Sequence, residues 1–162
     1  MAGAKTVGVM SDERSLDGES AAEGSMSKLR AGPSVRPARS GRVLVVDDEV
    51  AVGRTIQKLL GDRHDVVVVI GGRECIDLLE SGEDFDVILC DMSMPEVTGI
   101  EVFTRATACR PELAERFVFM TGGSFNARTR DFFETSKNQR IDKPFDLAAL
   151  RDAVRDRISK TR

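Results

Sequence analysis

The sequence predicts an α/β fold in which one five-stranded parallel sheet is covered by helices on both faces. The first observation is that five runs of strand length alternate with five segments of helical periodicity. The second is that most of these strand runs are continuously apolar, which is typical of parallel strands buried on both faces. The expected strands are Val43–Val46, Val66–Ile70, Val87–Cys90, Phe117–Met120 and Arg140–Asp142.

The first two strand and helix pairs follow from apolar residues in two different periods. Val43–Val46 is a continuous apolar run, and Val50–Leu60 has apolar residues at helical spacing along one side. Val66–Ile70 consists only of β-branched residues, so we expect a second buried strand there. A helical pattern continues over Glu74–Leu79, and Gly82 is placed to end that helix.

The middle of the chain repeats this alternation. Val87–Cys90 and Phe117–Met120 are continuous apolar runs and are expected to be the third and fourth strands. Between them, Ile100–Ala108 has apolar residues at helical spacing. Ala127–Thr135 is a more polar helix that carries two phenylalanines, and Arg140–Asp142 is a short fifth strand.

The last helix is expected over Leu147–Ile158, with Asp146 as its N-cap. Parallel strands need right-handed crossovers, which leaves few topologies for five strands alternating with five helices. The sequence therefore predicts a flavodoxin-like (βα)5 three-layer sandwich. Few residues follow the last helix, so we expect no appended output domain and output through protein contact.

Residues 1–40 differ in composition from the rest of this 162-residue chain. They are rich in Gly, Ser, Ala, Pro and Arg and lack apolar periodicity, so they cannot bury enough surface to offset the entropy of ordering. We expect a disordered N-terminal tail at 1–40 and one folded domain at 41–160. The formal net charge of −3 argues against nucleic acid or a membrane as the main partner.

The cysteines and the hydropathy pattern bear on location. Cys75, Cys90 and Cys109 are odd in number and lack metal-ligand spacing, so we expect small buried residues in a reducing cytosol. His64, the single histidine, lies in a polar loop and is expected to be solvated. No apolar run approaches the roughly 20 residues that span a bilayer, and no signal core is present. These patterns predict a cytoplasmic protein.

Polar side chains stand at the carboxyl ends of four predicted strands. Asp47 and Asp48 follow the first strand, Asp91 follows the third, Thr121 follows the fourth, and Lys143 follows the fifth. In an open α/β sheet, groups at the carboxyl ends of neighbouring strands converge on one crevice. The sequence therefore predicts one pocket that holds three carboxylates, one hydroxyl and one ammonium.

This set of groups suits a divalent cation and a phosphoryl group. Three close carboxylates repel one another, and a hard cation such as Mg²⁺, which prefers oxygen ligands, relieves that repulsion. An aspartate can attack a phosphoryl group and form an acyl phosphate. Lys143 would add positive charge and Thr121 a hydrogen bond, while Gly122 and Gly123 leave room beside the phosphate.

These residues resemble the receiver domain of bacterial two-component response regulators over about residues 41–160. The spacings that separate Asp48, Asp91, Thr121 and Lys143 are similar to those of the family. Further matching positions are Pro95, Gly99, Pro144 and Phe145. The resemblance implies a signalling module rather than an enzyme, with phosphorylation of itself and slow autodephosphorylation as its only reactions. It leans toward receiver domains of hybrid sensor kinases.

The resemblance also implies a role for each acid. Asp91 is then the phosphoacceptor, and Asp48 is a direct Mg²⁺ ligand. Asp47 would hold the metal mainly through water, and the backbone carbonyl of Ser93 would supply a third protein ligand. The implied phosphate donor is a sensor histidine kinase or a histidine phosphotransfer protein, and the implied output partner is a downstream protein.

Thr121 resembles the switch hydroxyl of the family, and Lys143 resembles the lysine that pairs with the phosphoryl oxygen. The resemblance implies a cis peptide before Pro144. One position departs from the pattern, because Arg140 stands where the family usually has Tyr or Phe. We expect this charged side chain to stay at the surface, and phosphorylation to shift a surface near Phe125–Phe133 and Arg140.

Two other functions fit parts of the pattern. A phosphohydrolase with an aspartyl nucleophile usually has a second acid two residues later, where this chain has Ser93. A pseudo-receiver, which is an interaction module on the same fold, needs no reactive groups, whereas all five are present here. Turnover of small phosphomonoesters would favour the first alternative, and an unmodified mass after treatment with an acyl phosphate would favour the second.

Overall fold

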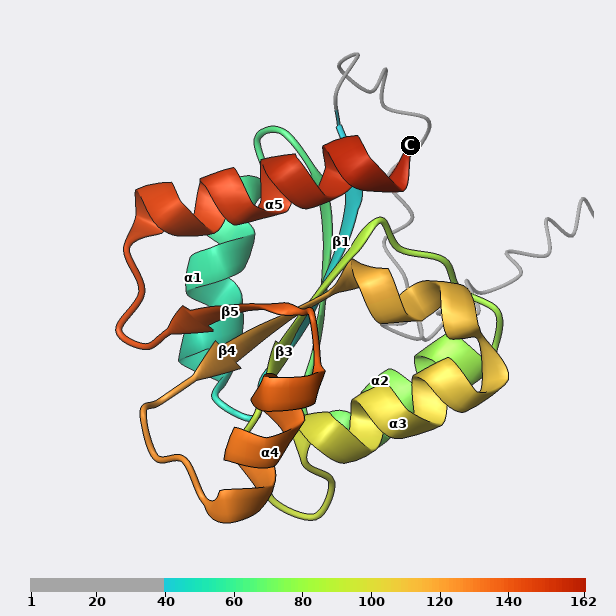
Figure 1. The fold of residues 1–162 in the computed structure, drawn as a ribbon. Coiled ribbons are helices and arrows are strands. Elements are labelled where there is room, and N and C mark those ends of the chain that lie inside the picture. Colours follow the sequence, from blue (N-terminus) through green and yellow to red (C-terminus); the bar gives the residue numbers. More distant parts are fainter. Residues whose placement is uncertain (1–39) are drawn as a thin grey trace, which may run out of the picture. The chain divides into compact units, whose positions relative to one another are not determined.

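The computed structural model describes residues 40–162, which Figure 1 shows as a coloured ribbon. The strands are β1 (Arg42–Val46), β2 (Asp65–Val69), β3 (Val87–Asp91), β4 (Phe117–Thr121) and β5 (Gln139–Asp142). The α-helices are α1 (Val50–Leu60), α2 (Gly72–Glu80), α3 (Gly99–Cys109), α4 (Ala127–Thr135) and α5 (Leu147–Thr161). A 3-10 helix, η1, spans Pro111–Arg116. The tail predicted at 1–40 lies, except for Ser40, outside the described residues.

The five strands form one sheet in the order β2-β1-β3-β4-β5, and every neighbouring pair is parallel. This is the flavodoxin-like order, so the predicted fold class is confirmed. The register places Val46 opposite Cys90, and Thr121 opposite Asp142. The carboxyl ends of β1, β3, β4 and β5 therefore reach the same rim of the sheet.

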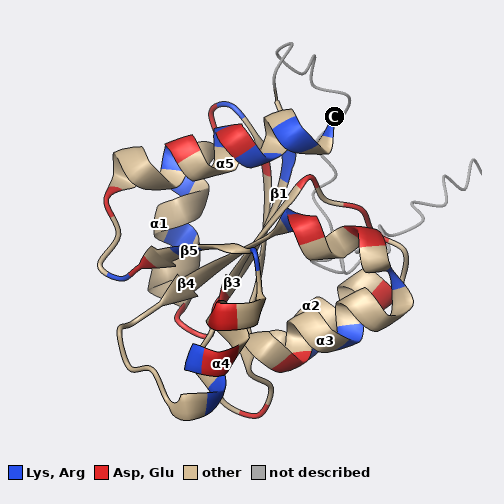
Figure 2. Ribbon diagram, in the orientation of Figure 1, with Lys and Arg blue, Asp and Glu red and all other residues tan. Residues whose placement is uncertain are grey.

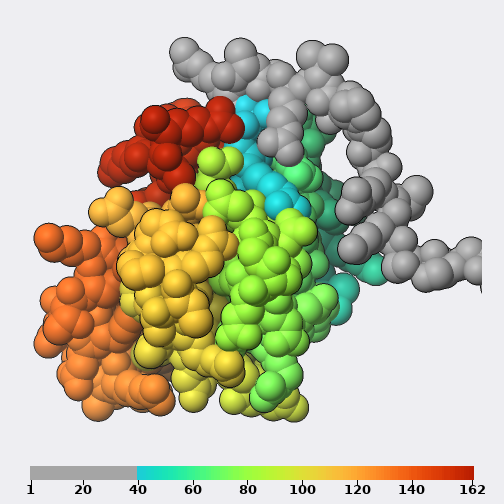
Figure 3. Space-filling view, turned by 90° about the vertical axis from the view of Figure 1, so that its right-hand side faces the viewer, coloured from blue at the N-terminus to red at the C-terminus, as the bar shows by residue number. Residues whose placement is uncertain are grey.

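Two apolar clusters fill the space between the sheet and its two helical layers. Residues of α1 and α5 pack against one face, and residues of α2 and α3 against the other, where phenylalanines of α4 also contribute. Figure 3 shows α2 and α3 side by side on the surface of the second layer. The alternation of buried side chains along β1 and β3 supplies both clusters, which is why these strands are apolar throughout.

The prediction of a fully buried second strand is wrong. In β2 the side chains of Val66–Val68 are only partly buried, and Ile70, which is 46% exposed, lies beyond the strand. The reason is the strand order, which places β2 at an edge of the sheet. An edge strand is covered less completely than a central strand of the same composition.

Two local expectations also need correction, and one short helix was not predicted. Cys75 and Cys90 are buried as expected, whereas Cys109 is exposed because it ends α3 beyond the buried stripe of that helix. His64 is partly buried rather than solvated, since its Nδ1 accepts a hydrogen bond from the backbone N–H of Gly41 at 3.2 Å. The helix η1 was not predicted, because only Leu113 within it is buried and it shows no periodic pattern.

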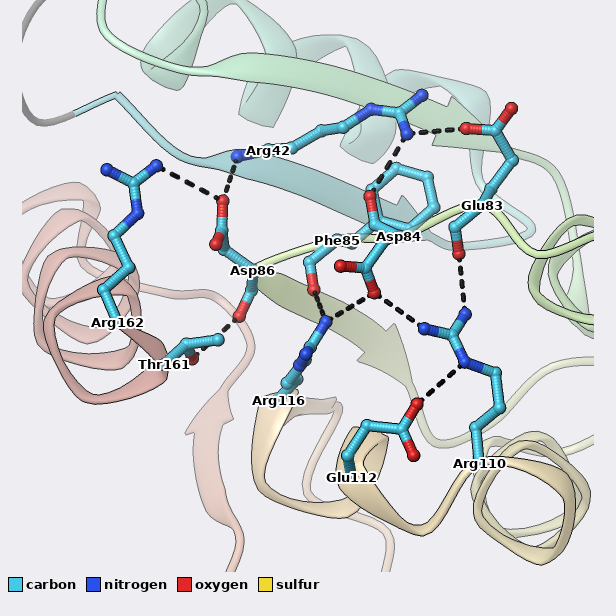
Figure 4. Close-up of polar contacts among 10 residues, drawn as sticks. All are labelled: Arg42, Glu83, Asp84, Phe85, Asp86, Arg110, Glu112, Arg116, Thr161 and Arg162. Carbon is cyan, nitrogen blue, oxygen red and sulfur yellow. Dashed lines mark hydrogen bonds and ion pairs between the residues drawn. The ribbon is translucent and has the colours of Figure 1, made fainter.

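Polar contacts hold the segment that leads into β3, as Figure 4 shows. The carboxylate of Asp84 accepts hydrogen bonds from Arg110 at 2.7 Å and from Arg116 at 2.6 Å. The guanidinium of Arg42 contacts Glu83 at 2.6 Å and lies over the ring of Phe85, 4.5 Å from its centroid. Exposed ion pairs stabilise a fold only modestly, so this network mainly positions the segment against β1 and η1.

The start of α3, next to the predicted site, carries a capping box. Thr98 Oγ1 accepts a hydrogen bond from the Glu101 N–H, and the Glu101 carboxylate accepts one from the Thr98 N–H. We expect Thr98→Ala to lower the free energy of unfolding by about 1 kcal/mol, measured in urea. Thr104→Ala is the control, because the Thr104 hydroxyl only donates to the Ile100 carbonyl within the same helix. Equal losses in both variants would contradict a capping role.

Within residues 40–162, no helix combines the length and the apolar character needed to cross a membrane.

Candidate functional site

The five polar residues predicted to converge do lie at one rim of the sheet. Asp47 and Asp48 follow β1 directly, and Asp91 and Thr121 are the last residues of β3 and β4. Lys143 follows β5 and donates its backbone N–H to the Thr121 carbonyl at 2.6 Å, which extends the β4–β5 ladder by one bond. The sheet order thus brings together residues that lie far apart in the sequence.

Three carboxylates form the centre of this site. One oxygen each of Asp47, Asp48 and Asp91 lies within 4.8 Å of the other two. Asp47 is fully buried and Asp91 is 4% exposed, while Asp48 is only partly buried. Such a group of acids is unfavourable in the absence of compensating positive charge.

Lys143 provides part of that positive charge. Its Nζ lies 2.7 Å from Asp47 Oδ2 and 3.5 Å from Asp91 Oδ1. Burial by itself lowers the pKa of Lys143, but the hydrogen bond to Asp47 and the two negative charges outweigh it and raise the pKa. The ammonium is therefore held in its charged form between the two most buried acids. The Lys143–Pro144 peptide is cis, as the resemblance implied.

Thr121 closes the site on the side of β4. Its side chain is buried, and Oγ1 accepts a hydrogen bond from the Gly123 N–H at 3.2 Å. Gly123 has a φ of 86°, which favours glycine, and a Cβ at either Gly122 or Gly123 would meet no atom within 4 Å. Neighbouring atoms therefore do not crowd the backbone of these two glycines, and the room that they would leave beside a phosphate stays a prediction.

Backbone N–H groups two residues further along the chain hold the carboxylates of Asp47 and Asp91. The Glu49 N–H donates to Asp47 Oδ1 at 2.9 Å, and the Ser93 N–H donates to Asp91 Oδ1 at 3.4 Å. A Cβ at Gly99 would lie 2.5 Å from the Asp91 backbone oxygen, so only glycine lets α3 start this close to β3. The sequence interpretation did not foresee the role of Glu49, and it noted Gly99 only as a matching position.

The pKa of Asp91 lies well above that of a free aspartate. Burial raises its pKa from 3.8 to about 6, although the positive charge of Lys143 acts in the opposite direction. The carboxylate is therefore costly to ionise in the folded protein unless more positive charge is added.

A pH dependence follows from this shift. A carboxyl group whose pKa is raised by folding stabilises the fold at low pH, and this contribution is lost as pH rises from about 4 through about 6. In chelator, Asp91→Asn should therefore be more stable than the unchanged protein at pH 8 by about 1–2 kcal/mol. The difference should vanish near pH 4. Urea unfolding at the two pH values measures it, and equal stabilities at pH 8 would contradict the stated cost.

The donor set fits a magnesium ion. Mg²⁺ is bound in proteins by one or two carboxylates together with waters and other oxygen ligands. Asp47, Asp48 and Asp91 offer only oxygen donors, within reach of one another. Burial raises the pKa of Asp91 despite the nearby charge of Lys143, so a further cation would stabilise the ionised carboxylate. The chemistry of the site therefore suits a hard divalent cation.

Arg140 lies at the surface, as expected. Its guanidinium carbon is 5.1 Å from the centroid of the Phe125 ring and 5.6 Å from that of Phe133. These distances are typical of cation–π contacts, so Arg140 covers two rings that connect the β4–α4 loop with α4. The sequence did not indicate these partners.

Comparison with known proteins identifies the family. The sequence model of the "Response regulator receiver domain" matches residues 43–155. "Two-component response regulator 24" of Arabidopsis thaliana is 35% identical over 111 residues, covering 66% of this chain and 76% of that protein. The "Chemotaxis protein CheY homolog" of Campylobacter jejuni is 29% identical over 117 residues, covering 71% and 90%.

Larger kinases also contain a matching segment. "Hybrid signal transduction histidine kinase H" of Dictyostelium discoideum is 37% identical over 82 residues. That match covers 51% of this chain but spans only 6% of the kinase. The match to the "Sensor kinase CckA" of Brucella abortus likewise spans 13% of that protein.

Solved structures confirm the fold. The receiver domain of the Francisella response regulator 1452 has a TM-score of 0.63 at 21% identity, covering 75% of this chain and 99% of that one. A response regulator receiver protein from Sinorhizobium medicae has a TM-score of 0.65 at 23% identity, covering 76% and 98%. With the family match over most of the described residues, these findings show that the chain belongs to the response regulator receiver domains of two-component signalling systems.

Proposed function

We propose that Asp91 accepts a phosphoryl group from a phosphohistidine of a sensor histidine kinase or a histidine phosphotransfer protein. The observation that carries this proposal is the position of the Asp91 carboxylate. It lies at the end of β3, next to two further acids and within 3.5 Å of the Lys143 ammonium. Membership of the receiver domain family supports the same assignment.

In the proposed reaction, an Asp91 carboxylate oxygen attacks the phosphorus of the donor. An O–P bond forms, the N–P bond breaks, and its electron pair returns to the imidazole of the donor. Lys143 neutralises charge on the phosphoryl oxygens, and Thr121 donates a hydrogen bond to one of them. Slow hydrolysis of the acyl phosphate would restore the carboxylate, so the domain would change its own state without turning over a substrate.

Magnesium is the proposed cofactor. Asp48 and Asp91 would be direct ligands, Asp47 would hold the ion mainly through water, and the Ser93 backbone carbonyl would be the third protein ligand. When bound, the cation would neutralise charge on the phosphoryl oxygens. Support comes from the three acids, whose oxygens lie within 4.8 Å of one another.

The proposed output is a change of surface that a downstream protein recognises. Thr121 would turn toward the new phosphate, and the segment Phe125–Phe133 with Arg140 would shift with it. The contacts of Arg140 with Phe125 and Phe133 support this proposal, because they join this surface to the loop that follows Thr121. A protein partner, rather than nucleic acid or a membrane, and a cytoplasmic location stay predictions.

We also propose residues 41–160 as the bounds of the receiver domain.

Two alternative functions that the sequence left open are less well supported. The family match does not favour a phosphohydrolase, and the position of a second acid in such enzymes is occupied by Ser93. A pseudo-receiver is not favoured either, since all five reactive residues are present and Asp47, Asp91 and Lys143 are in contact.

Intact mass measurement tests the proposal. After incubation with Mg²⁺ and a small acyl phosphate, the protein should gain the mass of one phosphoryl group. Chelation of Mg²⁺ should prevent the gain, and small phosphomonoesters should not be turned over. An unmodified mass in the presence of Mg²⁺ would count against Asp91 as an acceptor.

A further inference from the structure

A cavity of about 520 Å³ lies between α3, η1, α5 and the turn that connects α4 with β5. Glu115 of η1 precedes β4, and Lys137 of the turn precedes β5. The cavity is therefore at the amino ends of these strands, whereas Thr121 and Lys143 stand at their carboxyl ends. It is separate from the acidic site.

Basic residues dominate the charged lining of this cavity. Lys137, Arg157 and Lys160 line it, and Glu115 is the acidic residue among the lining side chains. Within residues 40–162, no ion pair joins any of these three basic residues to an acid. The cavity thus presents an excess of positive charge.

Two acids of α5 are paired with an arginine that does not line the cavity. Charges of both signs alternate along α5, as Figure 2 shows. Its acids Asp152 and Asp156 both pair with Arg155, at 3.0 and 3.4 Å, which leaves Arg157 and Lys160 without a partner from their own helix. By contrast, each arginine drawn in Figure 4 forms an ion pair with a carboxylate.

Arg157 also has a donor without an acceptor. One Nη1–H donates to the backbone carbonyl of Glu115, but Nε is buried and has no hydrogen-bond partner in the described part of the chain. Buried polar groups are nearly always paired in native structures, so an unpaired guanidinium donor is unusual. An anion next to this guanidinium would compensate for the missing partner through its charge and its contacts with the remaining N–H groups.

The uncharged part of the lining includes an aromatic side and a hydrogen-bonded turn. Phe103 and Phe132 meet edge to face, with ring centroids 5.3 Å apart, and both line the cavity. The Asn138 carboxamide donates to the carbonyls of Ala114 and Phe117 at 2.7 and 3.0 Å, which ties the α4–β5 turn to η1 and β4. The cavity is therefore preformed, and its volume lies within the range of about 300–1,000 Å³ typical of small-molecule sites.

We propose that this cavity binds a small organic phosphate that carries a flat aromatic group, the chemical class of the nucleoside phosphates. The flat group would lie against the aromatic side formed by Phe103 and Phe132, and the phosphate would face Lys137, Arg157 and Lys160. The proposal is independent of Asp91 phosphorylation, because no residue is shared between the two sites.

Titration calorimetry with ADP in chelator, on the Asp91→Asn variant, tests the proposal without interference from Mg²⁺ or phosphorylation. We expect saturable binding, weaker binding of inorganic pyrophosphate and none of adenosine. The double variant Lys137→Gln/Lys160→Gln should lower ADP affinity by about tenfold or more, since two charge-assisted contacts are lost. The control Lys58→Gln/Arg151→Gln makes the same change in net charge at exposed positions outside the cavity and should bind as before.

The lining double variant is expected to fold normally, because Lys137 and Lys160 are exposed. Arg157→Gln should weaken ADP binding as well, and its thermal unfolding reports whether loss of the bond to Glu115 disturbs the fold. Absence of ADP binding at millimolar concentration, or equal losses in the lining and control variants, would overturn the proposal. So would binding of an acidic peptide in place of ADP, since that would assign the site to a protein partner.

Discussion

Replacing Asp91 by asparagine is expected to abolish phosphorylation by a small acyl phosphate in the presence of Mg²⁺. The amide lacks the anionic oxygen that would attack phosphorus, and it also removes one acid from the proposed metal site. The folded state should persist, because Lys143 keeps its closer partner Asp47 at 2.7 Å. Intact mass should show no added phosphoryl group in this variant.

Asp142→Asn is the matched control for this loss. Asp142 ends β5 directly before Lys143, but its side chain is exposed and it does not belong to the acidic cluster. This variant should gain one phosphoryl group as the unchanged protein does. Incorporation into Asp91→Asn, located by peptide mapping on another residue, would show that the acceptor has been assigned wrongly.

Replacing Lys143 by methionine should destabilise the protein strongly when no divalent cation is bound. Methionine keeps an unbranched stem but removes the charge, which leaves Asp47 fully buried with no ammonium at 2.7 Å. Breaking a buried ion pair by removing one partner typically costs about 3–5 kcal/mol. We expect a loss of this size in urea unfolding at pH 8 in chelator, and a smaller loss with saturating Mg²⁺, since the cation would offset part of the unpaired charge.

Two comparisons isolate the charge effect from loss of packing. Lys58→Met changes an exposed lysine of α1 and should leave stability nearly unchanged. In an Asp47→Asn background, Lys143→Met should cost much less than in the unchanged protein, because the uncompensated carboxylate is gone. If the two backgrounds lose equal stability, packing of the lysine stem rather than its charge holds this part of the fold.

The sequence predicted the fold and the gathering of the site residues for one reason. Short continuous apolar runs that alternate with helical segments are typical of the strands of a parallel sheet, and the carboxyl ends of parallel strands share a rim. Residue order alone therefore placed Asp47, Asp91, Thr121 and Lys143 together, which the sheet order confirms. Their roles in metal binding and catalysis stay proposals.

Tertiary structure decided what depends on neighbours distant in sequence. The sequence of β2 reads as a central strand, but its edge position leaves Val66–Val68 half covered. Lys143 was expected to serve the phosphate, and the structure adds that it lies closer to Asp47 than to Asp91. Arg140 was expected at the surface, but its two aromatic partners depend on how the β4–α4 loop and α4 pack beside β5.

By itself, then, the sequence determined the alternation of strands and helices and the chemical groups at the ends of the strands, because periodicity and residue type are local properties. Only the folded chain decided which strand lies at the edge, which charges pair, and that the basic residues of α5 and the α4–β5 turn border one cavity. The physical reason is that burial and charge compensation depend on contacts between segments that are distant in sequence. Local sequence patterns do not show which of these segments come into contact.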